Sequence, residues 1–173
     1  MYLSAVLTAV TLSVCLASCG DDEDGGGGSG SSTVIVDGKQ YTMNYGWWEV
    51  RGKRLMLEFS NVNVYGPEHS INRYQELTLD ISNWQHSDVQ PGTYTAAMEF
   101  DAQIYDSSKD ELTEHETDVA GNVEVTIAKD GDNYIVTVPE TNVRLYDFND
   151  KVTGTVPFSF KYVGKLSVSP ERQ

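Results

Sequence analysis

The stretch TYTAAMEFDAQIY, residues 93–105, decides the fold, because it alternates between apolar and polar side chains along most of its length. Side chains two positions apart share one face of a β-strand, whereas an α-helix would spread the same residues around its axis. One face of this segment would carry Tyr94, Ala96, Met98, Phe100, Ala102 and Ile104. The spacing predicts a long strand with one buried and one solvated face.

The same period of two recurs along most of the chain after residue 33. The inward positions would include Leu55, Leu57, Phe59, Leu77, Leu79, Ile81, Val123, Val125, Ile127, Tyr134, Val136, Val138, Val156, Phe158, Phe160 and Tyr162. Turn signals separate the runs, among them Asp37-Gly38, which favours a type I′ hairpin turn, and the segment 130–133. We count about nine strands and find no convincing helix.

Short connections between neighbouring strands predict an antiparallel meander. Strands with one buried face fit either two packed sheets or a closed ring, so the prediction is an all-β, two-sheet β-sandwich, with a closed calycin-like β-barrel as the alternative. Pro157 favours the sandwich, because proline in a strand belongs at an edge or bulge and a closed barrel has no edge. A bulge is expected at residues 46–48, and a polar loop at 106–118.

The composition fits one acidic domain. The chain has 173 residues, a formal net charge of −14 and a pI near 4.4. Such a charge repels phosphate backbones, so nucleic acid is not an expected partner. Both cysteines, Cys15 and Cys19, lie in the first twenty residues, so the body of the chain offers no thiol for disulfide, catalytic or metal chemistry.

The N-terminus reads as a secretion signal followed by a lipid anchor. Residues 4–18 are apolar and uncharged, too short for a comfortable membrane span of about 20 residues but the length of a signal-peptide core. The tetrapeptide Leu16-Ala17-Ser18-Cys19 resembles a bacterial lipobox, which implies a signal peptide at residues 1–18 and acylation of Cys19. Two or three acyl chains would hold the protein firmly on a membrane.

An acidic tract follows the cysteine directly: Asp21, Asp22, Glu23 and Asp24. Here the chain resembles surface lipoproteins of the Bacteroidota, and that resemblance implies export to the outward face of the outer membrane; the alternative location is its periplasmic face. Residues 25–32 are glycine and serine and read as a flexible linker. The predicted organisation is therefore signal 1–18, anchor, acidic tract and linker 19–32, and one all-β domain 33–173.

No pattern for catalysis or metal binding stands out, so we predict no enzyme activity, no cofactor and no metal site. His69, His86 and His115 fall in three separate polar connections without the short spacing of metal ligands. The acidic segment 99–118 could attract Ca²⁺ but lacks the D-x-D-x-D-G loop pattern, so a solvated charged loop is the favoured interpretation. No G-x-S-x-G motif is present.

The aromatic residues are the candidates for ligand binding. Tyr45, Trp47, Trp48 and Trp84 lie at predicted strand ends or beside loops, and adjacent Trp47 and Trp48 must point to opposite faces of a regular strand. An exposed Trp would form a platform for sugars or partner side chains; the alternative is that these rings pack inside the domain. The predicted role is non-enzymatic binding of a glycan or a surface partner. The alternatives are an accessory subunit of an outer-membrane complex and a calycin-like carrier of a small apolar ligand.

Overall fold

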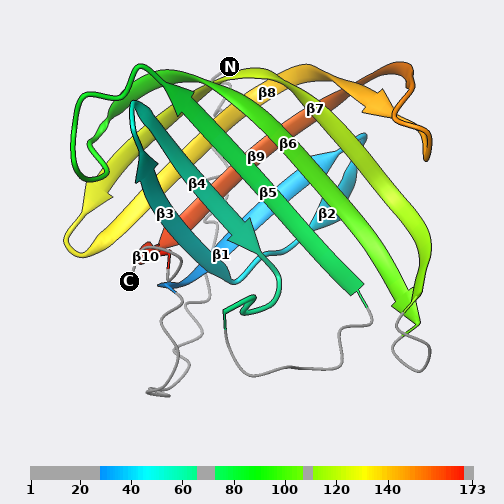
Figure 1. Cartoon of the computed structure of the whole chain (residues 1–173), viewed down its shortest axis with the longest axis horizontal. Helices are drawn as coiled ribbons and strands as arrows, with labels where there is room; N and C mark the ends of the chain where they lie inside the picture. The colour runs from blue at the N-terminus through cyan, green and yellow to red at the C-terminus, as the bar shows by residue number, and fades with distance from the viewer. Residues whose placement is uncertain (1–27, 66–72, 107–110, 170–173) are drawn as a thin grey trace, which may run out of the picture.

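The computed structural model describes residues 28–65, 73–106 and 111–169, and this part of the chain is built from strands without a helix. The ten strands are β1 (Gly28–Val36), β2 (Lys39–Tyr41), β3 (Tyr45–Arg51), β4 (Arg54–Ser60), β5 (Arg73–Ser82), β6 (Gly92–Asp106), β7 (Glu111–Asp130), β8 (Asn133–Tyr146), β9 (Val152–Gly164) and β10 (Ser167–Val168) (Figure 1). Within these ranges no candidate membrane-spanning helix occurs.

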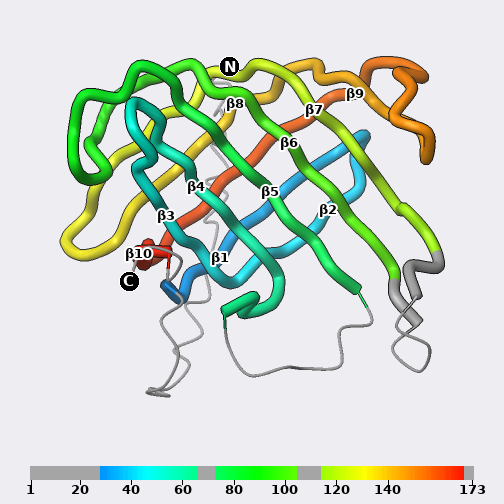
Figure 2. The backbone as a smooth tube through the Cα atoms, in the orientation of Figure 1, coloured from blue at the N-terminus to red at the C-terminus, as the bar shows by residue number. Residues whose placement is uncertain are grey.

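The strands form a meander that closes on itself. Strands β3 to β9 pair in sequence order, each antiparallel to the next, and β9 then pairs with β1. β1 completes the ring by pairing with β2 at one end and with the start of β3 at the other, and the backbone trace in Figure 2 follows this path. The short strand β10 lies parallel to β3 and makes the sheet mixed.

The all-β class and the antiparallel meander are confirmed. Hydrogen bonding joins all ten strands in one sheet, so the predicted division into two separate sheets is not confirmed. The ring is not a regular barrel either, because β1 meets β3 at only two residue pairs, Gly28 with Gly46 and Ser29 with Tyr45. The interruption between β2 and β3 lets β1 contact both of them.

The alternating side chains fill the interior of the ring as predicted. Phe59 lies between Phe160 and Tyr162, with ring centroids 4.8 and 4.9 Å apart, and Tyr41 packs on Phe100 at 5.0 Å. Burying such rings stabilises the fold by about 1.5–3 kcal/mol per large side chain. The inward face of β6 holds Ala96, Met98, Phe100 and Ala102, all buried.

The glycine-serine tract is the clearest departure from the expected domain boundaries. Residues 28–32, predicted as linker, form the first half of β1 and pair with β9 and β3. Ser32 is buried; its hydroxyl donates to the Met43 carbonyl at 2.7 Å and accepts from the Met43 N–H at 2.8 Å. The tract is glycine-rich where strands crowd: a Cβ on Gly30 would lie 2.5 Å from the Tyr162 ring.

Two local predictions are wrong. Residues 111–118, expected in a loop, begin β7, because the backbone pairing with β6 continues through them; residues 107–110 lie outside the described part. No bulge occurs at residues 46–48, where β3 pairs regularly with β4; the break falls at residues 42–44 instead. The two runs around residues 134–138 and 143–148 largely merge in β8, with a register shift between Val138 and Thr141.

The predicted hairpin at Asp37-Gly38 is confirmed, since both residues have positive φ, 49° and 77°. Pro157 also lies where proline is tolerated. β1 pairs with β9 only from Phe158 onward, so the edge of β9 at Pro157 has no β1 partner.

Candidate functional site

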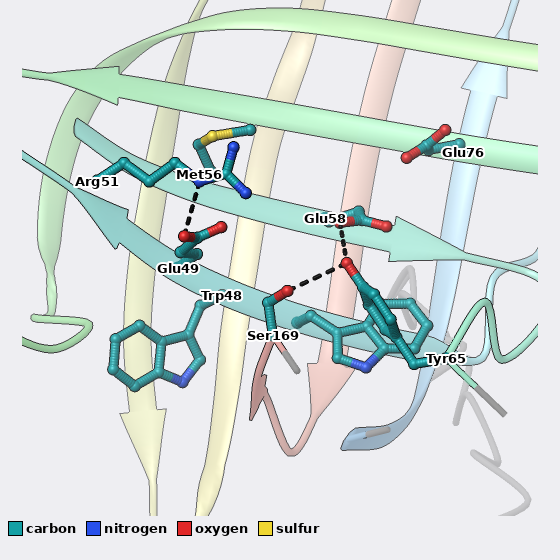
Figure 3. A pocket seen from close by; sticks show the side chains of 9 residues that line it. Trp48, Glu49, Arg51, Met56, Glu58, Tyr65, Glu76 and Ser169 are labelled. Atoms are coloured by element: carbon teal, nitrogen blue, oxygen red, sulfur yellow. Dashed lines mark hydrogen bonds and ion pairs between the residues drawn. The ribbon is translucent and has the colours of Figure 1, made fainter. Parts of the chain in front are cut away.

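A pocket of about 280 Å³ lies over the outer face of β3, β4 and β5 (Figure 3). We call it the β3–β5 pocket, and its lining is Trp47, Trp48, Glu49, Arg51, Met56, Glu58, Tyr65, Glu76 and Ser169. Strand alternation explains this set: Leu55, Leu57 and Leu77 point inward to the core, so Met56, Glu58 and Glu76 point outward. The register brings the strands together, because Trp47 lies directly opposite Glu58.

Trp47 is the most deeply buried side chain of this pocket. Its side chain is 0% exposed although it belongs to the outer face of β3. Tyr45 stacks on it, with centroids 5.9 Å apart and planes 16° apart, and Tyr65 packs almost perpendicular to it at 5.2 Å. The indole Nε1–H has no hydrogen-bond partner among the described residues. A buried donor left unsatisfied costs about 1–3 kcal/mol.

Polar side chains surround this indole. Arg51 Nε donates to Glu49 Oε1 at 2.7 Å, and Glu49 is 8% exposed. The Tyr65 hydroxyl donates to Glu58 Oε2 at 3.4 Å and accepts from Ser169 Oγ at 3.1 Å, as the dashed lines in Figure 3 show. On the next strand, Glu76 accepts from the Tyr74 hydroxyl at 2.9 Å. The pocket thus joins carboxylate acceptors, hydroxyl groups and one guanidinium.

The C-terminal end of the described chain forms one wall. Ser167 and Val168 of β10 pair with Trp47 and Trp48, and the Ser169 N–H donates to the Trp48 carbonyl at 2.9 Å. The first strand lies beside it, because Ser29 pairs with Tyr45 and the Ser29 carbonyl accepts from the Lys165 N–H at 3.1 Å. The pocket therefore lies next to the place where β1, β3 and β10 meet.

The structure brings together three of the four predicted ligand-binding aromatics. Tyr45 and Trp47 stack on the outer face, while Trp48, half-buried, lines the pocket and packs against the core. Trp84 lies elsewhere: it is 4% exposed, packs on Tyr94 at 5.0 Å and donates from Nε1 to the Asp88 carbonyl at 3.2 Å. No ring of this quartet forms a fully exposed platform. Cys19, Asp21, Asp22, Glu23 and Asp24 lie outside the described residues.

Sequence reasoning missed most of the pocket's polar groups. Glu49, Glu58 and Glu76 occupy outward positions of three successive strands, so alternation alone places each on the solvated face. Their gathering depends on strand register, which the hairpin turn at residues 51–54 could have supplied for β3 and β4. Tyr65, an aromatic residue at a strand end before a long loop, could be predicted to join this surface, as it does. Ser169 carried no signal, because it lies outside the regular strand patterns.

A second pocket, of about 370 Å³, is acidic. Its lining includes Glu99, Asp101, Asp118, Tyr146 and Asp150 on the outer face of β6 to β8 and the turn that follows. Burial raises the pKa of Asp118, and the nearby charge of Asp101 raises it further. No group of three metal-ligating side chains that could hold an ion occurs among the described residues. We assign no ligand to this pocket.

Comparison with known proteins gives no relative from which to transfer a function. No protein-family model, no curated protein and no solved structure matches the chain. The chemistry of the β3–β5 pocket must therefore carry the functional argument.

Proposed function

We propose that this protein is a lipid-anchored lipoprotein, facing outward on the outer membrane, whose all-β domain binds a ligand at the β3–β5 pocket without catalysing a reaction. The observation that carries the binding role is the Trp47 Nε1–H, a buried donor without a described partner in a pocket otherwise built of paired polar groups. An acceptor on a bound ligand would satisfy it. Histidine, the side chain that most often transfers protons in catalysis, is missing from the described lining.

The lipobox at Cys19 supports the anchored location. Nine positions separate Cys19 from Gly28, where β1 begins. A fully extended chain of that length spans at most about 30 Å, so the domain would stay close to the membrane. The acidic tract between them supports outward export by its resemblance to that of surface lipoproteins.

Fractionation tests the anchor and its orientation. Cys19→Ala should move the protein from membranes to the soluble fraction, because no acyl chain can then attach. Protease added to intact cells should cleave the wild-type protein, and Ala in place of all four acids of the tract should protect it. A Cys19→Ala protein that stays on the membrane would contradict lipid anchoring at Cys19. Unaltered cleavage of the tract variant would contradict a role of the acidic tract in export.

Binding to isolated outer membranes and to extracellular polysaccharide tests the domain. A labelled chain starting at Gly25 should sediment with one of these materials, and Trp47→Phe should weaken this binding about tenfold because it removes the indole N–H. Trp84→Phe is the matched control, since Trp84 Nε1 already donates to the Asp88 carbonyl. If wild type and Trp47→Phe bind equally, the β3–β5 pocket is not the binding site.

One observation favours the accessory-subunit alternative. Phe148 is 73% exposed in the turn between β8 and β9, where Asp147 Oδ1 accepts from the N–H groups of Asn149 and Lys151 and fixes the turn. A rigid exposed aromatic suits a protein contact. In that case Phe148→Ala would release the lipoprotein from a larger complex on native gels. The carrier alternative gains no support, because aromatic side chains fill the ring.

A further inference from the structure

The geometry points to the class of ligand: we propose that the β3–β5 pocket binds one uncharged, hydroxyl-rich sugar residue at the end of a glycan, through hydrogen bonds rather than ring stacking. This inference rests on the proposed binding function and specifies its substrate. It depends on what Trp47 can offer, on the surrounding polar groups and on the size of the pocket.

Trp47 cannot act as a stacking platform. Tyr45 occupies one neighbouring position at 5.9 Å with its plane nearly parallel, and Tyr65 packs against the same indole at 5.2 Å. With 0% of the side chain exposed, neither a sugar ring nor a cation can lie on its face. What remains for recognition is the Nε1–H, which can only donate.

Tyr65 is the side chain that would move to admit a ligand oxygen. Its hydroxyl joins two groups of the pocket, Glu58 at 3.4 Å and Ser169 at 3.1 Å. The first distance exceeds the usual range of about 2.5–3.0 Å for hydroxyl donors, so this bond is weak. A ligand hydroxyl that replaces the Tyr65 hydroxyl at Glu58 would gain a carboxylate partner as the ring turns off Trp47.

The polar lining selects the chemistry of the ligand. Each sugar hydroxyl can donate to a glutamate and accept from the Trp47 N–H, which satisfies both kinds of group. A simple ammonium ligand has no acceptor for the indole. An acidic sugar would meet three glutamates and one arginine, Arg51, which already binds Glu49. An uncharged polyol is the class that meets both demands.

The size of the pocket sets the length of ligand. About 280 Å³ falls just below the range of about 300–1,000 Å³ for pockets that enclose drug-sized ligands. One monosaccharide unit would fill it, whereas a longer glycan would extend into solvent. The pocket is therefore expected to recognise the terminal sugar of a glycan.

The inference can be tested by titrating methyl glycosides into a soluble form of the domain, the chain from Gly25 onward. The probes are methyl glucoside, galactoside, mannoside and N-acetylglucosaminide, with methyl glucuronide and tetramethylammonium as charged competitors. At least one neutral glycoside should bind, and Glu76→Gln and Trp47→Phe should each weaken it about tenfold, the loss of one hydrogen bond worth about 1.4 kcal/mol. Glu124→Gln, exposed on the outer face of β7, should leave binding unchanged.

Glu76→Gln still tests the proposal if Trp47→Phe fails to fold, because this substitution removes a charge without changing the shape of the side chain. Methyl glucuronide or tetramethylammonium bound as tightly as the neutral glycosides, or no neutral glycoside bound at all, would overturn the sugar assignment. Sedimentation with outer membranes that still depends on Trp47 would, in either case, leave the binding function standing. If sedimentation does not depend on Trp47, both the sugar assignment and the binding function of the β3–β5 pocket are wrong.

Discussion

At the residue scale, Glu116 ties together three strands that are distant in sequence. It occupies a bulge in β7, since His115 pairs with Gln103 and Thr117 with Ala102. Its side chain is 9% exposed, and Oε1 accepts from Lys39 Nζ of β2 at 3.0 Å and from Arg73 Nη2 of β5 at 3.2 Å. The hydrogen bond from Lys39 to Glu116 raises the pKa of that lysine. The bulge therefore places the Glu116 carboxylate where it can bind cations from both β2 and β5.

We expect Glu116→Gln to destabilise the domain by about 1–2 kcal/mol. Breaking a fully buried ion pair costs about 3–5 kcal/mol, but both cations here are about half exposed, so solvent reduces the loss. Urea denaturation measures it, with the exposed Glu140→Gln on β8 as the control. Equal midpoints for the two variants would show that the tie contributes nothing.

Asp118 makes the opposite contribution. Burial, together with the charge of Asp101, raises its pKa, so the folded state holds its proton more tightly than the unfolded chain does. Its contribution to stability therefore falls as the pH rises from the ordinary value of 3.8 through the raised pKa. Asp118→Asn should raise the melting temperature at pH 7, and the free energy of unfolding should rise by no more than about 1 kcal/mol. Both gains should vanish below pH 3.8. If thermal denaturation shows that the gain in stability persists below pH 3.8, ionisation of Asp118 is not its cause.

At the scale of elements, part of the glycine-serine tract belongs to the sheet. Composition alone reads residues 25–32 as linker, yet Gly28 to Ser32 belong to β1. Gly30 is needed because Tyr162, whose hydroxyl donates to the Lys165 carbonyl at 2.5 Å, occupies the space where its side chain would lie, whereas a Cβ on Gly28 would meet the Lys165 carbonyl. Serine and glycine are poor in strand propensity, so tertiary packing imposes this conformation.

Gly30→Ala should accordingly destabilise the domain by about 1–3 kcal/mol, the usual range for overpacking. Its Cβ would lie 2.5 Å from the Tyr162 ring, whereas a Cβ on Gly154 of β9 would meet nothing within 4 Å. Gly154→Ala is therefore the matched control and should lose little or no stability in chemical denaturation. If residues 28–32 were linker, the two variants would unfold alike.

The elements that sequence predicts well are those whose pattern is local. Alternation identified the inward faces of β4, β5, β6 and β9, and Asp37-Gly38 identified its turn, because these signals depend on neighbouring residues only. The failures required distant partners. Polar residues 111–118 become a strand because β6 continues beside them, and residues 28–32 do so because β9 and β3 lie on either side.

The candidate site shows the same limit at a larger scale. Its aromatic members Tyr45, Trp47 and Trp48 were predictable as candidates, since large rings beside strand ends stand out in the sequence. Sequence left their burial open as an alternative to exposure, because Tyr65, which packs on Trp47, comes from a segment with no periodic signal. The lining combines three neighbouring strands with Ser169 near the end of the described chain, and that juxtaposition appears only in the folded sheet.

For the whole molecule, closure depends on a few residues at its start, and this leads to a last prediction. Both residue pairs between β1 and β3, and three of the seven between β1 and β9, involve residues 28–32. A chain beginning at Thr33 also loses the paired hydrogen bonds between Ser32 and Met43. At about 1 kcal/mol for each lost hydrogen bond, we expect it to melt roughly 10 °C lower than a chain beginning at Gly25.

Opening the ring would also uncover Tyr162 and Phe59, so the shorter chain should bind a hydrophobic dye that the longer one does not. Tyr45, which stacks on Trp47, would lose its backbone partner Ser29, and Trp47-dependent ligand binding should disappear with it. Equal melting temperatures for the two chains would contradict a ring closed by β1. Unequal melting with intact binding would show instead that the β3–β5 pocket forms without closure, on β3, β4 and β5 alone.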